Sequence, residues 1–101
     1  MRFSLKLPYP VLPGDADEVR TTVALIRHAV TQKYPQGLPR VELRAWAKIE
    51  DLLDQGGPEV ELSPSQWSFL HDAVMAASWP VQWAKPVIVF LDAIADAERQ
   101  G

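Results

Sequence analysis

The sequence predicts an α+β domain, mostly helical, in which four helices pack with a small two-stranded sheet in the order β-α-α-β-α-α. Two short stretches alternate apolar and polar residues with a period of two, which is typical of half-buried strands. Four longer stretches repeat their apolar residues at helical spacing, and prolines and glycines separate most of them. A chain of 101 residues is long enough for one core but too short for two, so we expect residues 1–101 to form a single domain.

The strongest local signal is the segment Glu59–Trp67, which predicts a short strand leading directly into a capped helix. Ser63 stands at the N-cap position, a proline follows at the first helical position, and Gln66 stands at the third. Gln66 can therefore reach back to close a capping box. Leu62 and Trp67 have the spacing of a hydrophobic staple, so both are expected to face the core.

The first strand is predicted at residues 2–7, whose apolar side consists of Phe3, Leu5 and Leu7. If it pairs with the strand at residues 59–62, basic residues can lie across from acidic ones. These residues are Arg2 and Lys6 on one strand and Glu59 and Glu61 on the other. The pattern leaves open whether the strands run parallel or antiparallel. Prolines between Pro8 and Pro13 forbid both helix and ladder, which predicts an extended connector.

Two helices are predicted between the strands. An N-cap at Asp15, with Glu18 at the third helical position, predicts the start of the first helix. The second helix is predicted from about Arg40 to Gln55, with Gly56 just past its end. The expected apolar stripes are Val19, Val23, Ile26, Val30 and Tyr34 in the first helix, and Ala45, Trp46, Ile49, Leu52 and Leu53 in the second.

Two further helices are predicted after Ser63. The first of them is interrupted at Trp79-Pro80, and the last ends near Glu98. Pro86 either starts or kinks the last helix, and the sequence does not decide between the two. The residues expected to face inward are Trp67, Phe69, Leu70, Ala73, Val74, Ala76 and Ala77 in the third helix, and Val87, Phe90, Leu91 and Ile94 in the fourth.

The composition excludes several classes of protein. There is no cysteine, so a disulfide framework and a thiolate metal site are both impossible. The first ten residues contain Lys6 and two prolines where a signal peptide needs an unbroken apolar run. The apolar run Val87–Leu91 is far shorter than the ~20 residues that span a bilayer. We therefore expect a cytoplasmic protein without a membrane partner.

The charged residues are unevenly placed along the chain. Residues 1–50 carry eight Lys/Arg and five Asp/Glu, a charge of +3, whereas residues 51–101 carry two and eight, a charge of −6. Arg40, Arg44 and Lys48 recur every four residues and therefore share one helical face. This basic stripe is either an ordinary solvated face or a contact surface for an acidic protein or a phosphate backbone.

The sequence contains no convergent set of catalytic residue types. His28 and His71 lie on different predicted helices, and neither has a second ligand at metal-binding spacing. His71 and Asp72 are neighbours on a helix, so their side chains are expected to point about 100° apart. Asp92 and Asp96 share a helical face, which is typical of a solvated surface unless a cleft perturbs the pair. We therefore expect a protein that is not an enzyme and needs no cofactor or metal.

A helix-turn-helix formed by the last two helices is also disfavoured. The would-be recognition helix carries Lys85 as its one basic residue before Arg99, and its two aspartates would repel phosphates. Nucleic-acid binding, if any, is expected at the basic stripe.

The tryptophans provide a second candidate contact surface. Trp46 and Trp67 have core positions in the helical patterns. Trp79 and Trp83 flank the break at Pro80, where at least one indole is expected to be exposed as an anchor for a protein partner. The alternative is that both indoles cap the end of the core.

Taken together, these segments resemble the small accessory proteins encoded by tailed phages and prophages. The resemblance is carried by the N-terminal strand ending in Leu7-Pro8, the step from Val60 to Trp67, the turn from Trp79 to Lys85, and the closing Ile94–Ala97. It implies a role in assembly or host interaction and assigns no residue a function. We expect a protein-interaction module that docks on a larger assembly or modulates a host protein. The alternatives are a transcription regulator that uses the basic stripe and a homodimer formed through strand edges.

Overall fold

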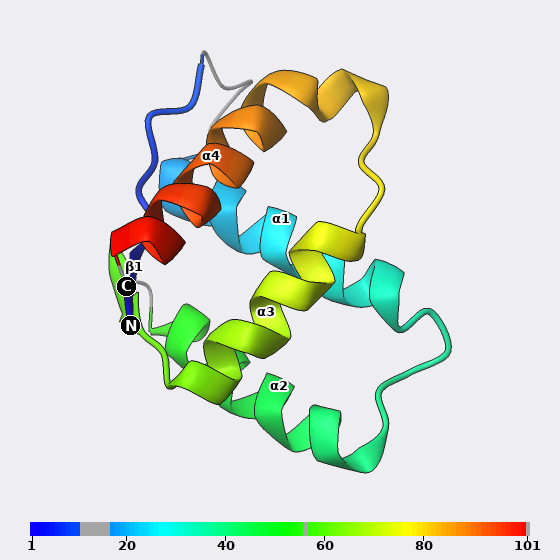
Figure 1. Cartoon of the computed structure of the whole chain (residues 1–101). Helices are drawn as coiled ribbons and strands as arrows, with labels where there is room; N and C mark the ends of the chain where they lie inside the picture. Colours follow the sequence, from blue (N-terminus) through cyan, green and yellow to red (C-terminus); the bar gives the residue numbers. More distant parts are fainter. Residues whose placement is uncertain (11–16, 56, 101) are drawn as a thin grey trace.

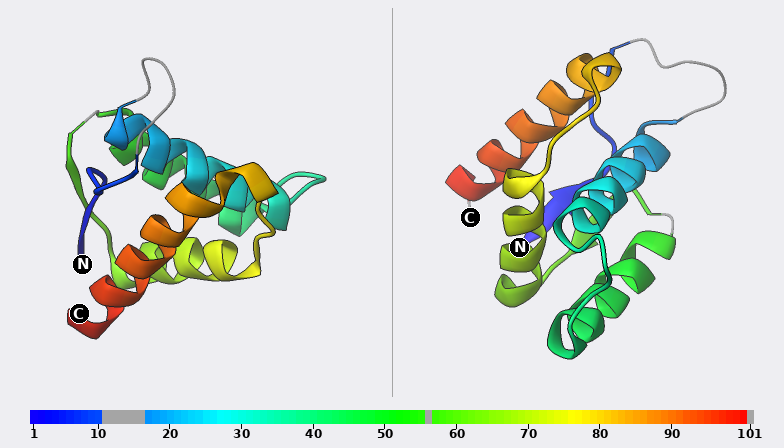
Figure 2. Two further views of the ribbon diagram at one scale, coloured as in Figure 1. Left: turned by 90° about the horizontal axis from the view of Figure 1, so that it is seen from above. Right: turned by 90° about the vertical axis from the view of Figure 1, so that its right-hand side faces the viewer.

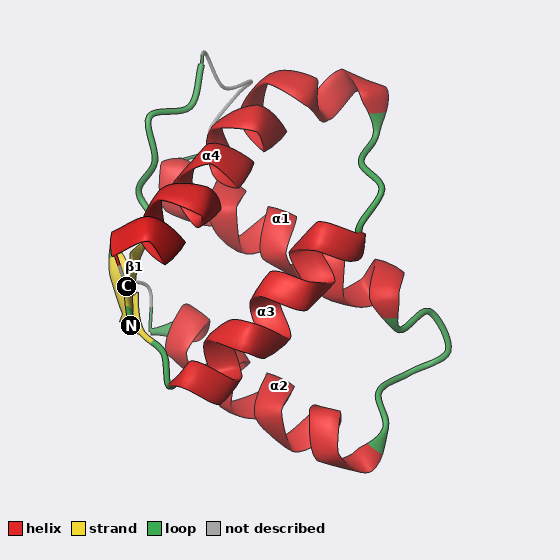
Figure 3. Ribbon diagram, in the orientation of Figure 1, coloured by secondary structure: helices red, strands yellow, loops and turns green. Residues whose placement is uncertain are grey.

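The computed structural model describes residues 1–10, 17–55 and 57–100, and its element order is the predicted one. Within these residues, four α-helices pack with a two-stranded antiparallel sheet, which lies at the left margin of the molecule in Figures 1 and 3. The elements are β1 (Arg2–Ser4), α1 (Glu18–Lys33), α2 (Arg40–Asp54), β2 (Glu59–Glu61), α3 (Pro64–Ala76), the 3₁₀ turn η1 (Val81–Trp83) and α4 (Ala84–Gln100). The prediction of a mostly helical α+β fold is confirmed.

The two strands pair in the register that sets Arg2 opposite Glu61, Phe3 opposite Val60 and Ser4 opposite Glu59. Arg2 therefore lies near both acidic residues of β2, with Nε 3.6 Å from Glu59 and 3.7 Å from Glu61. Lys6 was also expected opposite these acids, and that expectation is wrong. The last backbone hydrogen bond between the two segments runs from the Leu5 N–H to the carbonyl of Pro58, so the pairing ends before Lys6.

The capping box at the start of α3 is confirmed. The Gln66 N–H donates to Ser63 Oγ at 3.2 Å, and the Ser63 N–H donates to Gln66 Oε1 at 2.8 Å. Leu62 and Trp67 are both buried, as the staple spacing predicts. Pro86 stands in the first turn of α4, where a missing N–H costs no intrahelical hydrogen bond, so it belongs to the start of that helix and does not kink it.

The cap of α1 differs from the prediction. Asp17 is the N-cap, and its carboxylate accepts the N–H of Arg20 at 2.7 Å. The predicted cap Asp15 lies outside the described residues, as do Pro13, Gly14 and Gly56. The buried side of α1 is also rotated from the predicted stripe, and it consists of Thr22, Leu25, Ile26, Ala29 and Val30.

The core is one cluster to which every helix and both strands contribute. Helix α3 packs against both α1 and α2, and it crosses the front of the molecule in Figure 1. Phe3 of β1 links the sheet to the helices, because its ring lies 5.6 Å from that of Trp67 and 6.5 Å from that of Phe90. Ala76 was expected to face inward but is exposed, since it stands in the last turn of α3, beyond the packed part of the helix.

Ion pairs and aromatic contacts hold α2 in place. Arg27 of α1 lies 3.0 Å from Asp54 and 3.8 Å from Glu50 on α2. Phe69 of α3 stacks on Tyr34 at 6.1 Å and lies 6.5 Å from Trp46. These contacts are partly exposed, so each stabilises the fold only modestly.

Candidate functional site

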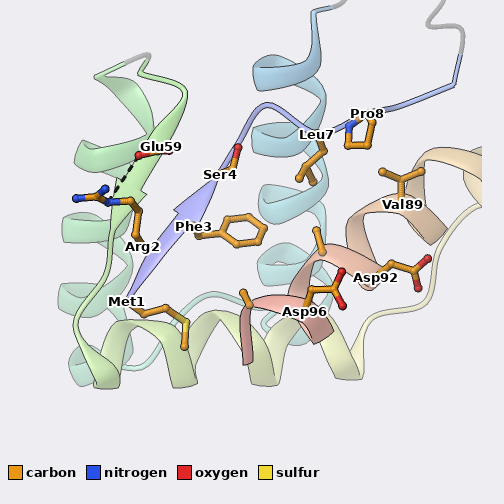
Figure 4. Close-up of a pocket in the computed structure, with 12 residues that line it drawn as sticks. Met1, Arg2, Phe3, Ser4, Leu7, Pro8, Glu59, Val89, Asp92 and Asp96 are labelled. Atoms are coloured by element: carbon orange, nitrogen blue, oxygen red, sulfur yellow. Dashed lines mark ion pairs between the residues drawn. The ribbon is translucent and has the colours of Figure 1, made fainter. Parts of the chain in front are cut away.

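A groove opens between the N-terminal segment and α4. Its volume is about 830 Å³, within the range of ligand-binding pockets in proteins. The N-terminal segment contributes Met1, Arg2, Phe3, Ser4, Leu7 and Pro8, and Glu59 adds to that wall. Helix α4 contributes Val89, Asp92, Ala93, Asp96 and Ala97 (Figure 4).

The sequence explains why this face of α4 leaves room. Its groove-lining residues Val89, Ala93 and Ala97 recur every four positions, so they form one row along the helix. Two of the three are alanines, whose short side chains fill little of the space between helix and strand. The groove therefore has an apolar floor, while Asp92 and Asp96 supply acidic groups at its edge.

The N-terminal segment is fixed against α1 by a buried hydrogen-bond chain. Thr22 is completely buried, and its Oγ1 donates to the carbonyl oxygen of Leu5 at 2.6 Å. The same oxygen atom lies 2.6 Å from the Tyr9 hydroxyl, which acts as the donor because Thr22 has one hydroxyl proton. Burial raises the pKa of the Tyr9 phenol above its ordinary value, and the hydrogen bond with Thr22 opposes that shift in part.

The structure places Trp79 and Trp83 around His28 of α1. The imidazole ring lies 5.1 Å from each indole, and the Trp79 ring also lies 6.2 Å from Phe90. His28 Nε2 is 2.9 Å from the carbonyl oxygen of Ser78, so the histidine also binds the linker between α3 and η1. Both indoles are partly buried and pack against the core, so each keeps part of its surface exposed. Their role in partner binding stays a prediction.

Val81 is the exposed apolar residue of the 3₁₀ turn η1, and 90% of its surface is exposed. It is the first residue of η1, between Trp79 and Trp83 in the sequence.

The basic stripe lies on α2, away from both the groove and the tryptophans. Arg40, Arg44 and Lys48 are exposed, and no carboxylate of the described residues lies within 4.0 Å of their charged nitrogens. Figures 1 and 2 show α2 and the linker between α3 and α4 at different ends of the molecule. The predicted contact residues therefore form two separate surfaces and not one site.

Of the residues considered for catalysis, His71 lies beside two carboxylates. His71 Nε2 is 3.2 Å from Glu98 of α4, and His71 Nδ1 is 3.5 Å from Asp72. The second contact contradicts the expected divergence of these two neighbouring helical side chains. Searching the described residues finds no group of three or more His, Asp or Glu that could hold a metal ion.

The sequence does not predict the groove, although it contains two signals for it. The strand predicted at residues 2–7 has an edge through which a homodimer was one alternative, and Asp92 and Asp96 share one predicted helical face. The packing of α4 beside β1 brings these two features together. The residues that form the two walls lie more than eighty positions apart in the sequence.

None of the helices in the described part of the chain is both long and apolar enough to cross a lipid bilayer. Comparisons of the chain with protein-family models, with curated proteins and with solved structures found no match.

Proposed function

We propose that this protein is a non-enzymatic interaction module that binds a protein partner in the groove between β1 and α4. By the resemblance of its sequence segments, it acts as an accessory protein of a phage or other mobile element. It docks on a larger assembly or modulates a host protein, in the host cytoplasm or the virion. The observation that supports this proposal is a recess of about 830 Å³ whose floor is apolar and whose edge is charged.

Two properties of the recess favour a protein partner over a small metabolite. It is long and open, since it follows the chain from Met1 to Pro8 on one side and α4 from Val89 to Ala97 on the other (Figure 4). Small-molecule sites bury most of their ligand and combine a few convergent polar groups. Here the polar groups are spread along the rim, as they are at the edge of a protein-binding surface.

Photo-crosslinking from three surfaces tests the location of the contact. A photoreactive phenylalanine analogue replaces Val89 in the groove, Val81 beside the tryptophan pair, or Ala47 beside the basic stripe. We expect adducts with a defined protein from the Val89 position in the cell that naturally makes this protein. Adducts from Val81 or Ala47 alone would move the contact to the surfaces that the sequence suggested. An absence of adducts from all three positions would overturn the proposal.

A transcription regulator that uses the basic stripe is the second candidate. It is favoured by the exposure of Arg40, Arg44 and Lys48 without acidic partners among the described residues. Opposing it, α2 also carries four acidic residues, which are Glu42, Glu50, Asp51 and Asp54. The helix as a whole is therefore net negative, which weakens its attraction for a phosphate backbone.

A further inference from the structure

The outer edge of β1 has unpaired backbone groups. In an antiparallel ladder, opposite residues alternate between pairs that exchange two backbone hydrogen bonds and pairs that exchange none. Met1 and Leu62 exchange both, at 2.7 Å and 2.6 Å, so Phe3 is the next bonded position of β1. Arg2 and Ser4 are the non-bonded positions, and their N–H and C=O groups therefore point away from β2.

This unpaired edge lies beside the groove. Figure 4 shows β1 with β2 on one side and α4 on the other, and the view from above in Figure 2 has the same order. Met1 and Asp96 lie toward one end of the groove, and Pro8 and Val89 toward the other. An extended chain that enters between β1 and α4 can hydrogen-bond to Arg2 and Ser4 as a third strand, and its inward side chains then meet the apolar floor.

The acidic residues of α4 match the repeat of such a strand. Asp92 and Asp96 are four residues apart, which corresponds to a rise of about 6 Å along the helix. Side chains on one face of a strand repeat every two residues, or about 6.6 Å. Asp92 has no ion pair with another described residue, and Asp96 has an exposed contact of 3.6 Å with Arg99. Two basic side chains at alternate positions of the added strand would therefore meet both carboxylates.

We propose that the groove binds an extended segment of a partner protein, which adds to β1 as a third strand and places Lys or Arg at alternate positions against Asp92 and Asp96. This inference rests on the proposed function and specifies the chemistry of the partner. A second copy of this chain fits less well, because two identical grooves would bring like carboxylates together.

A short synthetic peptide tests the inference directly. The probe is acetyl-Thr-Val-Lys-Val-Lys-Val-Thr-amide with a fluorescent label, and its binding to the whole chain is measured by fluorescence anisotropy at low salt. Two comparison peptides are used. In the first, both lysines are replaced by glutamate, and in the second, the backbone nitrogens on one edge are methylated. We expect the lysine peptide to bind and both comparison peptides to fail, since the first lacks the charges and the second lacks the strand hydrogen bonds.

Matched variants of the protein separate charge from strand pairing. The double variant Asp92→Asn/Asp96→Asn and the control Asp51→Lys change the net charge by the same +2, and Asp51 is an exposed residue of α2. We expect the double variant to weaken peptide binding by roughly 2- to 30-fold and the control to leave it unchanged. Ser4→Pro removes the outward N–H of the strand edge, where proline is tolerated, and should also weaken binding. Circular dichroism establishes that each variant is folded.

The outcomes distinguish this inference from the proposed function. Equal binding of the glutamate or methylated peptide would overturn the inference. A dimer in sedimentation velocity that Ser4→Pro dissociates would also overturn it, in favour of a second copy as the occupant. If Val89 crosslinks to a partner whose contacting segment is helical or acidic, the inference fails while the proposed function stands. If neither crosslinks nor peptide binding are observed, both fail.

Discussion

Replacing Thr22 by valine should destabilise the protein by removing a buried hydroxyl that joins the N-terminal segment to α1. The hydroxyl donates to the Leu5 carbonyl and accepts from Tyr9, and in the described residues no buried polar side-chain atom lacks a partner. The substitution leaves the Leu5 carbonyl without its side-chain donor, which costs about 1–3 kcal/mol, and it removes the Tyr9 bond, worth about 1 kcal/mol. The methyl group that valine adds returns about 0.8 kcal/mol.

The free energy of unfolding should therefore fall by about 1–3 kcal/mol. Urea unfolding measures it, and with a slope of about 1–3 kcal/mol per molar the midpoint should fall by roughly 1 M. Thr21→Val is the matched control, because its hydroxyl donates to the Asp17 carbonyl at an exposed position. That control should change the stability by no more than about 0.5 kcal/mol.

A double-mutant cycle with Tyr9→Phe extends the test. Tyr9→Phe alone should cost about 1 kcal/mol, and the double variant should cost less than the sum, since both changes remove the same bond. Equal urea midpoints for Thr22→Val and Thr21→Val would refute the assignment of Thr22 as the residue that holds the groove wall. Strict additivity in the cycle would refute the Tyr9 contact.

Three further predictions follow from particular contacts. Ser63→Ala should lower the free energy of unfolding by about 1 kcal/mol through loss of the capping box, whereas the exposed Ser68→Ala should leave it nearly unchanged, both measured in urea. Burial raises the folded-state pKa of Tyr9 above 10.0, so its contribution to stability is complete below pH 10 and is lost as the pH rises through the folded-state pKa. Thermal unfolding at increasing alkaline pH should show this loss, and Tyr9→Phe should reduce it. In a gel-shift assay at low salt, the protein should not bind duplex DNA, either before or after charge reversal of the basic stripe. Salt-dependent DNA binding that is abolished by the charge reversal would instead establish the transcription regulator.

The parts of the fold that could be predicted from the sequence are those whose causes lie within a few residues. The start of α3 depends on Ser63 and Gln66, and both hydrogen bonds of their box form as expected. The alternating pattern of residues 2–7 correctly indicates that Phe3, Leu5 and Leu7 are buried, although the ladder includes only the first half of it.

The start of α1 was ambiguous because the sequence Asp15-Ala-Asp17 offers two caps of the same type. The capping-box rule prefers Asp15, whose third helical residue is Glu18, but the observed cap is Asp17. The rotated face of the helix has a similar cause. Thr22 is buried because Leu5 and Tyr9 satisfy its hydroxyl from another segment, and no helical pattern within α1 contains that information.

The groove could not be predicted, because neither wall signals the other. Read alone, Asp92 and Asp96 are a solvated helical face, and β1 is a strand with an unpaired edge. Their juxtaposition depends on the packing of Phe3 against Phe90, which sets the distance between strand and helix. A contact between residues this far apart in sequence follows from the tertiary structure and from no local rule.

The uneven charge of the chain is explained in part by this arrangement. The negative charge of the second half is countered at two places by the first, since Arg2 lies beside Glu59 and Glu61, and Arg27 beside Asp54. No basic residue of the described first half reaches the two aspartates of α4, which face the groove from its other wall. Asp92 and Asp96 thus lie beside an unpaired strand edge, and among the described residues Asp96 has one exposed contact, with Arg99 of its own helix. A basic, extended segment would satisfy both the acidic charge and the backbone groups at this edge.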